Sequence, residues 1–454
     1  MFYKKKHIKT SISSAILQPS IVLAGALPAY AGDAAIPQIF KGDVQNNKFE
    51  KVGRAQLHFD TFDALQYLSI DDGHVDGRLI AEQHYGRLKS VSDDDLIMYR
   101  ERPSQVAHRG SCARPLGWEP PSKRVKRKAE EEDGKKDRED KENAKISAQS
   151  FPRDCKIKLV ADDLFDAEIG DGNHDKTMGY MISAIARAND IFRETDWLDN
   201  RDTKEEAKDF GFTISSIEIW NDASDPDKYL NRTDIEDTNN TKFDDECTQS
   251  DSRMICRYLK AFAKKVVIEE EWNGMKKKVC LAHLFTHKDF DNGILGLAHI
   301  GKKASSDSPT SSSMGICAGK PDKYGAYLNT ALTTTLNWEK KILTAEADLV
   351  TAHELGHNWG AGHDNDPKED YNPSDYTCEP GPPNGKYIMY RNAVSGSFLN
   401  NKRFSPCSKF DVLSKLLVCG EDSFEMLNED KCENYKVDPG EQCDAGIRLS
   451  SGSK

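Results

Sequence analysis

Long apolar runs are largely missing from this sequence of 454 residues. Beyond residue 31, no segment approaches the ~18 consecutive apolar residues that cross a bilayer, so we expect no membrane anchor in this chain. Mean hydropathy is −0.69, and 30% of the residues are charged. These values favour soluble domains, and the length predicts two or three of them rather than one compact core.

An excess of positive charge is also missing. The chain has 63 Lys and Arg against 75 Asp and Glu, which gives a net charge of −12. A dedicated nucleic-acid binder would need a large basic surface, so this balance argues against nucleic acid as a partner.

Residues 1–31 have the pattern of a secretory signal peptide. Lysines cluster within residues 4–9, a mostly apolar run covers 12–27, and Ala29-Tyr30-Ala31 has the small-x-small form of a cleavage site. Gln18 and Pro19 interrupt the apolar run, so a disordered N-terminus or a misplaced start codon is the alternative interpretation.

Cysteines and glycosylation patterns also favour the secretory pathway, and thus a cell-surface or extracellular location. The chain has 11 cysteines, an odd number that leaves at least one unpaired or without its partner. Asn231-Arg-Thr and Asn239-Asn-Thr both fit the N-glycosylation pattern, and Asn231 and Asn239 are the predicted acceptors.

A charged stretch divides the chain. Residues 32–127 contain one cysteine and short apolar runs at 64–68 and 96–99, which predict strands of a small domain. Arg124-Val-Lys126-Arg127 then precedes a linker over 128–150, whose residues 128–145 are almost wholly charged and cannot bury a core. A furin-type processing protease is expected to cut after Arg127 and release residues 32–127 as a prodomain. The alternative is an ordinary charged linker.

Residues 151–425 have the pattern of an α/β domain, and residues 426–454 are too few for another whole domain. Apolar spacing predicts strands at 156–161, 212–219, 279–285 and 294–300, and helices at 178–192, 254–268 and 346–359. Strands that alternate with helices imply a largely parallel sheet.

The stretch HELGHNWGAGHD, residues 353–364, is predicted to be a metal site. His353 and His357 are four residues apart, which places both imidazoles on one face of a helix. Glu354 follows the first ligand, where it can take a proton from a water activated by the metal. A His-Glu-x-x-His match alone also occurs in proteins that bind no metal.

Gly360 and His363 extend the match. A glycine ends a helix sharply, so the chain can turn back and bring His363 to the same ion as a third ligand. Three protein ligands leave an open position, which is typical of a catalytic zinc site with one Zn²⁺ ion. This extended motif also requires a methionine turn downstream, and Met389 in Tyr387-Ile-Met-Tyr390 is the candidate.

These motifs resemble the ADAM family of metalloproteases, adamalysin- or reprolysin-type metzincins. Within that family the chain resembles first the branch of the tumour-necrosis-factor-α-converting enzyme and next the Kuzbanian-like branch. The resemblance is carried by the motif with Asp364, the methionine turn, and four further stretches: Val279-Cys-Leu-Ala-His-Leu-Phe-Thr286, Ile342-Leu-Thr-Ala-Glu-Ala-Asp-Leu-Val-Thr-Ala-His353, Ala393-Val-Ser-Gly396 and Asn400-Asn-Lys402. Cys432-Glu-Asn-Tyr-Lys-Val-Asp-Pro-Gly-Glu-Gln-Cys443 is similar to the opening of a disintegrin domain, so residues 426–454 are expected to begin one.

The resemblance implies a metzincin fold, a twisted and mostly parallel sheet with an active-site helix and a small C-terminal subdomain. It implies that the three histidines hold zinc, that Glu354 is the general base and that Met389 lies beneath the metal. It further implies that Leu295 and Gly296 belong to the edge strand that pairs with substrate. Ala393 and Val394 are expected to line the specificity pocket on the primed side of the scissile bond, C-terminal to it.

Four disulfides are expected. The resemblance implies Cys155–Cys280, Cys317–Cys419 and Cys378–Cys407, and elimination then pairs Cys247 with Cys256. Cys112 is alone in residues 32–127, and in this family a prodomain cysteine can occupy the open zinc position. We therefore expect Cys112 to be an inhibitory switch; a free or mispaired thiol is the alternative.

The sequence thus predicts a zinc endopeptidase that is made as a zymogen and acts on protein or peptide substrates. The resemblance points to shedding of membrane-protein ectodomains. Two alternatives are a freely secreted protease that cuts soluble or matrix proteins, and an adhesion protein with an inert protease fold.

Overall fold

The computed structural model describes the backbone of five strands between residues 38 and 100, and then most of residues 110–424. The ranges in that second part are 110–118, 152–198, 207–225, 228–230, 247, 252–272, 275–304, 312–366, 378–381, 383–396 and 398–424. Contacts divide the chain into two units, of which the second spans Gln105–Leu427.

The first unit contains a five-stranded antiparallel sheet whose strands pair in chain order. Each strand pairs antiparallel with the next, as expected for successive hairpins. The predicted strands at 64–68 and 96–99 are confirmed as β3 and β5. The strands are β1 (Gln38–Gln45), β2 (Lys51–Phe59), β3 (Leu65–Asp71), β4 (Asp76–Ala81) and β5 (Leu96–Arg100).

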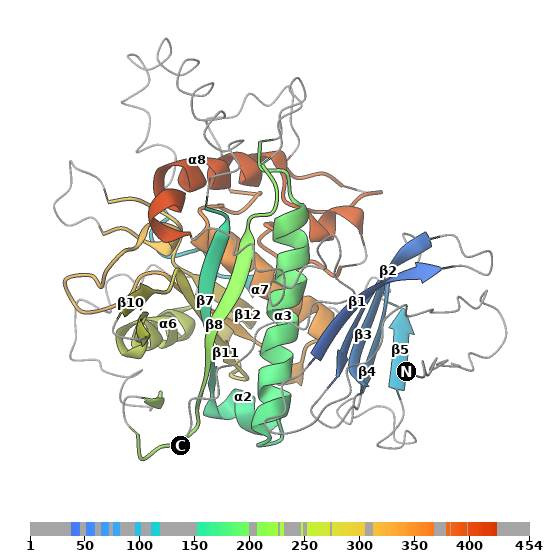
Figure 1. Ribbon diagram of the computed structural model, residues 1–454, viewed down its shortest axis with the longest axis horizontal. Helices are drawn as coiled ribbons and strands as arrows, with labels where there is room; N and C mark the ends of the chain where they lie inside the picture. Colours follow the sequence, from blue (N-terminus) through green and yellow to red (C-terminus); the bar gives the residue numbers. More distant parts are fainter. Residues whose placement is uncertain are drawn as a thin grey trace, which may run out of the picture. The chain divides into compact units, whose positions relative to one another are not determined.

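The second unit alternates strands and helices along the chain (Figure 1). Its strands are β6 (Ser111–Cys112), β7 (Asp154–Asp162), β8 (Gly211–Trp220), β9 (Glu269–Trp272), β10 (Met275–Lys278), β11 (Leu281–Thr286), β12 (Ile294–Ala298), β13 (Thr330–Thr334), β14 (Leu336–Asn337) and β15 (Lys340–Lys341). Its helices are α2 (Asp163–Glu168), α3 (His174–Glu194), α6 (Arg253–Lys265), α7 (Thr344–Asn358) and α8 (Pro406–Ser423), with short 3-10 turns η4 (Asp291–Gly293), η5 (Gly315–Cys317) and η6 (Leu399–Lys402).

Six of these strands form one sheet in the order β6-β12-β13-β11-β7-β8. Strands β13, β11, β7 and β8 run parallel, and β12 runs antiparallel to β13. The predicted mostly parallel α/β sheet with an active-site helix is therefore confirmed. The antiparallel strand β12 lies towards the edge, where β6 adds to it in parallel.

Helices cover both faces of this sheet. On β11, Leu284 belongs to the apolar cluster that includes Leu259 and Phe262 of α6. Its neighbour His283 points to the other face, because successive side chains of a strand alternate. There the His283 ring contacts the Thr333 hydroxyl, which lies beside α7. Helix α3 packs against α7 on that same face.

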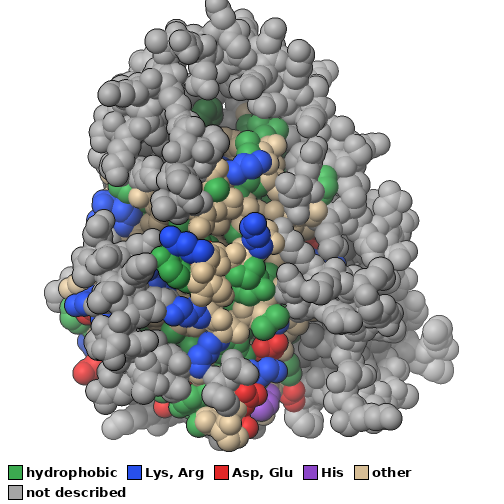
Figure 2. Space-filling view, turned by 90° about the vertical axis from the view of Figure 1, so that its left-hand side faces the viewer, with side chains coloured by type: hydrophobic (Ala, Val, Ile, Leu, Met, Phe, Trp, Pro, Cys, Tyr) green, Lys and Arg blue, Asp and Glu red, His purple; other side chains and the backbone are tan. Residues whose placement is uncertain are grey.

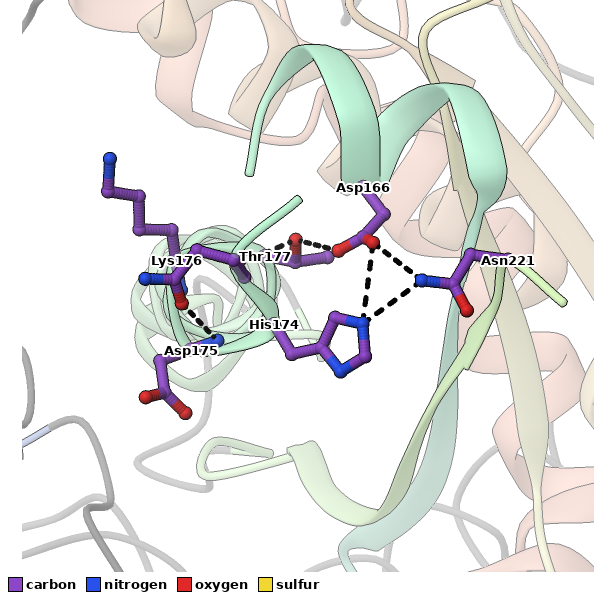
Figure 3. A network of polar contacts seen from close by, with 7 residues as sticks. Asp166, His174, Asp175, Lys176, Thr177 and Asn221 are labelled. Carbon is purple, nitrogen blue, oxygen red and sulfur yellow. Dashed lines mark hydrogen bonds and ion pairs between the residues drawn. The ribbon is translucent and has the colours of Figure 1, made fainter. Parts of the chain in front are cut away.

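A buried carboxylate fixes the start of α3 (Figure 3). Asp166 of α2 is 3% exposed and accepts hydrogen bonds from the Thr177 hydroxyl at 2.6 Å and from the Asn221 amide at 2.8 Å. The His174 ring lies 3.5 Å from the same carboxylate. Asn173 accepts the backbone N–H of Asp175, which is a typical N-cap. These bonds hold α2, α3 and the end of β8 together.

An aromatic cluster closes the end of the active-site helix. Trp359, directly after α7, lies within 5.1 Å, centroid to centroid, of the rings of Phe192 and Phe212. Phe424, just past α8, is 5.0 Å from the same indole. The large residue at 359 is thus a core residue that joins α3, β8, α7 and the end of α8.

The structure contains all four expected disulfides: Cys155–Cys280, Cys247–Cys256, Cys317–Cys419 and Cys378–Cys407. Among the described cysteines, Cys112 is the one outside a disulfide, and it is buried. Cys432 and Cys443 lie outside the described residues.

On the face that Figure 2 shows, the described basic side chains are spread out. In the part of the face that Figure 2 shows with its side chains assigned, Lys and Arg are spaced among apolar and uncharged side chains, and acidic side chains gather at its lower edge. Within the described residues, no helix is long and apolar enough to cross a membrane.

Candidate active site

Helix α7 carries the first two histidines of the motif. The spacing of four residues places His353 and His357 on one face, with ring centroids 4.6 Å apart. Both side chains are buried, at 2% and 0% exposure. Burial of two polar rings on one helix face needs compensating partners, and the surrounding backbone provides them.

The chain reverses directly after α7. Gly360 has φ = 111°, in the region that favours glycine, and its N–H donates to the His357 carbonyl at 2.8 Å. A Cβ on this glycine would also lie 2.4 Å from the Lys415 side chain. The turn brings His363 back, so that its ring centroid lies 4.8 Å from His357 and 5.3 Å from His353.

Backbone carbonyls fix which nitrogen of each ring faces the centre. Nδ1 of His353 lies 2.7 Å from the Ile388 carbonyl oxygen, and Nδ1 of His357 lies 2.7 Å from that of Ala361. A carbonyl oxygen only accepts, so both Nδ1 atoms carry the proton. Nε2 of each ring is therefore the atom with the free lone pair, which is the arrangement of metal-binding histidines.

Burial favours the neutral form of the His353 and His363 rings. It lowers the pKa of His353 to about 4 and holds the pKa of His363 well below its ordinary value, where the neighbouring rings of His357 and His353 act in the same direction. Neutral imidazole is the form that binds a metal ion.

The three rings fit a metal ion. Their ligand nitrogens all lie within 4.8 Å of one another, and Nε2 of His357 and Nε2 of His363 are 3.2 Å apart. Nε2 of His353 is buried with no hydrogen-bond partner among the described residues. A cation at the centre would satisfy all three lone pairs, and three nitrogen ligands suit zinc.

The methionine turn lies beneath these rings. Met389 is fully buried, and a Cβ on Gly356 of α7 would lie 2.6 Å from its sulfur, so the thioether packs directly against the helix. The Met389 carbonyl accepts the N–H of Asp364 at 2.9 Å. The Met389 carbonyl therefore holds the segment after His363. The carbonyl of Ile388, the residue before Met389, orients the His353 ring.

Glu354 is buried between α7 and β12. It is 0% exposed, and burial raises its pKa well above the ordinary value, while the Cys112 thiol partly opposes this shift. A Cβ on Gly296 would lie 2.4 Å from Oε1 of Glu354. Gly296 therefore leaves the space that the carboxylate occupies.

The segment 110–118 lies along β12 on its free side. Strand β6 runs parallel to β12, with the Ala113 N–H donating to the Gly296 carbonyl at 3.0 Å and the Leu116 N–H to the Ala298 carbonyl at 2.9 Å. On its other side, the Cys112 N–H donates to the Arg391 carbonyl at 2.9 Å. Segment 110–118 thus lies as an added strand between β12 and residues 391–393.

Cys112 is the third residue of that segment and lies beside the histidines. Its thiol is within 4.8 Å of ligand atoms of His353 and Glu354. Burial raises the pKa of the thiol well above its ordinary value, and the charge of Glu354 adds to this. Of the residues predicted to bind substrate, Leu295 and Ala393 pack in one buried apolar cluster with Cys112. Gly296 lies opposite Cys112 in register, and Val394 is buried beside Ala393.

The remaining predicted site residues lie outside the described residues. They are Arg124, Lys126 and Arg127 of the processing sequence and the glycosylation candidates Asn231 and Asn239.

The sequence analysis missed Asp366, an acidic residue whose carboxylate lies close to the ring of His363. Its carboxylate lies 3.6 Å from Nδ1 of His363, and on the other side Arg114 of segment 110–118 lies 3.6 Å from it. At this separation, which is longer than a hydrogen bond, the carboxylate places a negative charge behind the ring of the third histidine. An acidic residue three positions after a ligand histidine was the available signal.

The fold and the three-histidine centre define a metallopeptidase of the metzincin type. The family model of M12B reprolysin-like metallopeptidases matches residues 175–417, more than half of the chain. The chain therefore belongs to this metallopeptidase family, and its relatives carry ADAM-type names.

Three relatives illustrate the similarity. The disintegrin and metalloproteinase domain-containing protein 17 homolog of Caenorhabditis elegans is 31% identical over 307 residues, which are 64% of this chain and 40% of the relative. The disintegrin and metalloproteinase domain-containing protein 10 of Xenopus laevis is 28% identical over 372 residues, which are 77% of this chain and 43% of the relative. The protein 10 of Homo sapiens is 37% identical over 177 residues, which are 37% of this chain and 22% of the relative. The chain spans less than half the length of these curated relatives.

Proposed function

We propose that this chain is a zinc metalloendopeptidase whose ion is held by His353, His357 and His363. One observation carries the proposal: three buried imidazoles bring their ligand nitrogens within 4.8 Å of one another, next to a buried glutamate and beside strand β12, with which an extended segment pairs. That combination provides a metal, a proton carrier and a place for an extended peptide.

Zinc at this centre would polarise the scissile carbonyl and acidify a water molecule. Glu354 is the general base: its carboxylate accepts the proton of the attacking water and then donates it to the leaving amine. Burial raises the proton affinity of this carboxylate, which suits a group that must first accept a proton and then release it. Gly296 leaves room for the carboxylate.

Substrate binding follows from β12. An extended peptide can add to its free side through main-chain hydrogen bonds, as segment 110–118 does in this structure. The side chain after the scissile bond would then enter the apolar cluster of Leu295, Ile342, Ala347, Val350 and Ala393. We expect preference for aliphatic side chains there.

Segment 110–118 makes the chain a zymogen in this proposal. The Cys112 thiolate would take the open metal position, where the cation offsets the cost of ionising a buried thiol. Residues 32–127 would be a prodomain removed after Arg127, which leaves the linker 128–150 and the catalytic domain 151–425. Residues 1–31 would be the signal peptide, and 426–454 the start of a disintegrin domain.

Shedding of membrane-protein ectodomains at the cell surface is the physiological role that we propose, because the relatives belong to the disintegrin and metalloproteinase series. Two experiments test the function. A peptide library is incubated with the processed chain, with and without a chelator. Cells that express a tethered reporter ectodomain then report shedding. Chelator-sensitive cleavage is expected in the first assay and reporter release in the second. Peptide cleavage without release would favour a protease that cuts soluble proteins, and no cleavage at all would reject the peptidase.

A further inference from the structure

Asn358, the last residue of α7, is buried between that helix and the sheet. It is 0% exposed and directly follows the ligand histidine His357. Its Nδ2 donates to the His299 carbonyl at 2.8 Å and to the Thr330 carbonyl at 3.2 Å. An amide nitrogen carries two hydrogens, so both bonds can form at once. One side chain therefore ties the end of the active-site helix to β13 and to the residue after β12.

The two carbonyls mark the place where the pair of β12 and β13 ends. The His299 N–H donates to the Thr330 carbonyl at 3.1 Å, and Asn358 then supplies the donor that the His299 carbonyl needs. Directly beyond, the Gly301 N–H donates to the His357 carbonyl at 2.8 Å. A Cβ on Gly301 would lie 2.7 Å from the Asn358 carbonyl oxygen. The end of the helix and the end of the strand are therefore in direct contact.

The opposite side of the same stretch accepts an extended chain. The Ala298 carbonyl accepts the N–H of Leu116 at 2.9 Å, and the Ile300 N–H donates to the Leu116 carbonyl at 3.0 Å. Between these two residues, His299 directs its N–H and its carbonyl inwards, to β13 and to Asn358. Asn358 thus lies directly behind the stretch of main chain with which an added strand pairs.

A second polar contact joins α7 to the sheet two turns earlier. The Thr351 hydroxyl lies 3.3 Å from that of Thr333, and a spacing of seven residues places Thr351 and Asn358 on the same helix face. Glu354 lies between them in the helix. Thr333 pairs in register with Gly296, the residue that leaves space for the Glu354 carboxylate. The two contacts therefore fix α7 against the sheet on both sides of the general base.

We propose that Asn358 is a positioning residue of this peptidase, which sets the distance between the metal centre on α7 and the stretch that pairs with substrate. It acts through its neighbour His357 on one side and through the His299 carbonyl on the other. A peptide held along Ala298–Ile300 then presents its scissile carbonyl at the three histidines. This inference rests on the proposed peptidase function.

Two inhibitors of the processed chain separate metal binding from peptide positioning. Acetohydroxamate binds only the metal, whereas a peptidyl hydroxamate binds the metal and pairs with the β12 stretch at the same time. Asn358→Ala should leave the inhibition constant of acetohydroxamate unchanged. It should raise that of the peptidyl hydroxamate about tenfold, because a displacement below 1 Å spoils the fit of one ligand to both places. For a peptide that spans the cleft, kcat should fall by a similar factor with zinc retained.

Asn189→Ala is the matched control. Asn189 is 2% exposed and donates from α3 to the Phe212 carbonyl of β8, at the other edge of the sheet, at 2.8 Å. Its loss should lower stability comparably and leave both inhibition constants unchanged. Asn358→Asp keeps the shape of the side chain and has at most one hydrogen to donate. It should show a smaller rise, about threefold, in the same direction.

A peptidyl hydroxamate constant within 1.5-fold of the wild type would overturn the proposal, in Asn358→Ala or, if that protein does not fold, in Asn358→Asp. An equal rise for both inhibitors would also overturn it, because that result indicates a general loss of structure. A wild type that neither holds zinc nor cleaves peptides would instead reject the peptidase function and the positioning role with it.

Discussion

Substitution of Gly296 by alanine should selectively damage catalysis. The new Cβ would lie 2.4 Å from Oε1 of Glu354 and 2.7 Å from its Cδ. Ordinary contact begins near 3.4 Å, so the carboxylate would have to move by about 1 Å. A misplacement of that size at a reacting group costs about 100-fold in rate. The three histidines lie elsewhere around the centre, and their metal affinity should persist.

The assay is steady-state hydrolysis of one peptide by the processed chain, with zinc content measured on the same samples. Gly296→Ala should retain its zinc and lose about 100-fold in kcat. Gly362→Ala is the matched control, because a Cβ there would meet only the Trp118 indole, at 3.5 Å or more, and should leave kcat unchanged. A Gly296→Ala enzyme with kcat within threefold of the wild type would refute the assigned position of the Glu354 carboxylate.

Two further perturbations address inhibition and stability. Cys112→Ala should give an uncleaved precursor with measurable peptidase activity, and a precursor as silent as the wild type would end the thiol-switch hypothesis. Burial raises the pKa of Asp162 from 3.8 to about 6, so its ionised form costs the folded state up to ~3 kcal/mol above pH 6 and nothing below pH 4. Asp162→Asn retains a capping oxygen for the Phe165 N–H. The difference in unfolding free energy between mutant and wild type, from denaturant titrations, should therefore favour the mutant more at pH 8 than at pH 4; a pH-independent difference would contradict this.

The sequence predicts features that depend on local spacing. The interval between His353 and His357 fixes their common helix face, and Gly360 marks the turn towards His363, so the three-histidine cluster could be predicted from one short stretch. Helices α3, α6 and α7 and the apolar strands followed for the same reason, whereas helix α8 (Pro406–Ser423) was not predicted. The periodicity of the predicted elements is set by the residues themselves.

Features that depend on distant contacts could not be predicted. The carbonyl of Ile388 orients His353 only because the fold brings the methionine turn under α7. Strand β13, with three threonines among its five residues, lacks an apolar pattern and was missed. The turn at Trp338 lacks the Asn-Gly signal, because Asp289, forty-nine residues away, holds it instead.

The central claim is that His353, His357 and His363 hold one zinc ion and that Glu354 transfers the proton. Zinc content and peptide hydrolysis of Glu354→Ala, compared with the wild type in its processed form, test it most directly. One zinc per chain in both proteins, with hydrolysis lost in the mutant, is the expected result. Hydrolysis by the mutant at the wild-type rate would contradict the mechanism, and absence of zinc from the active wild type would contradict the metal site.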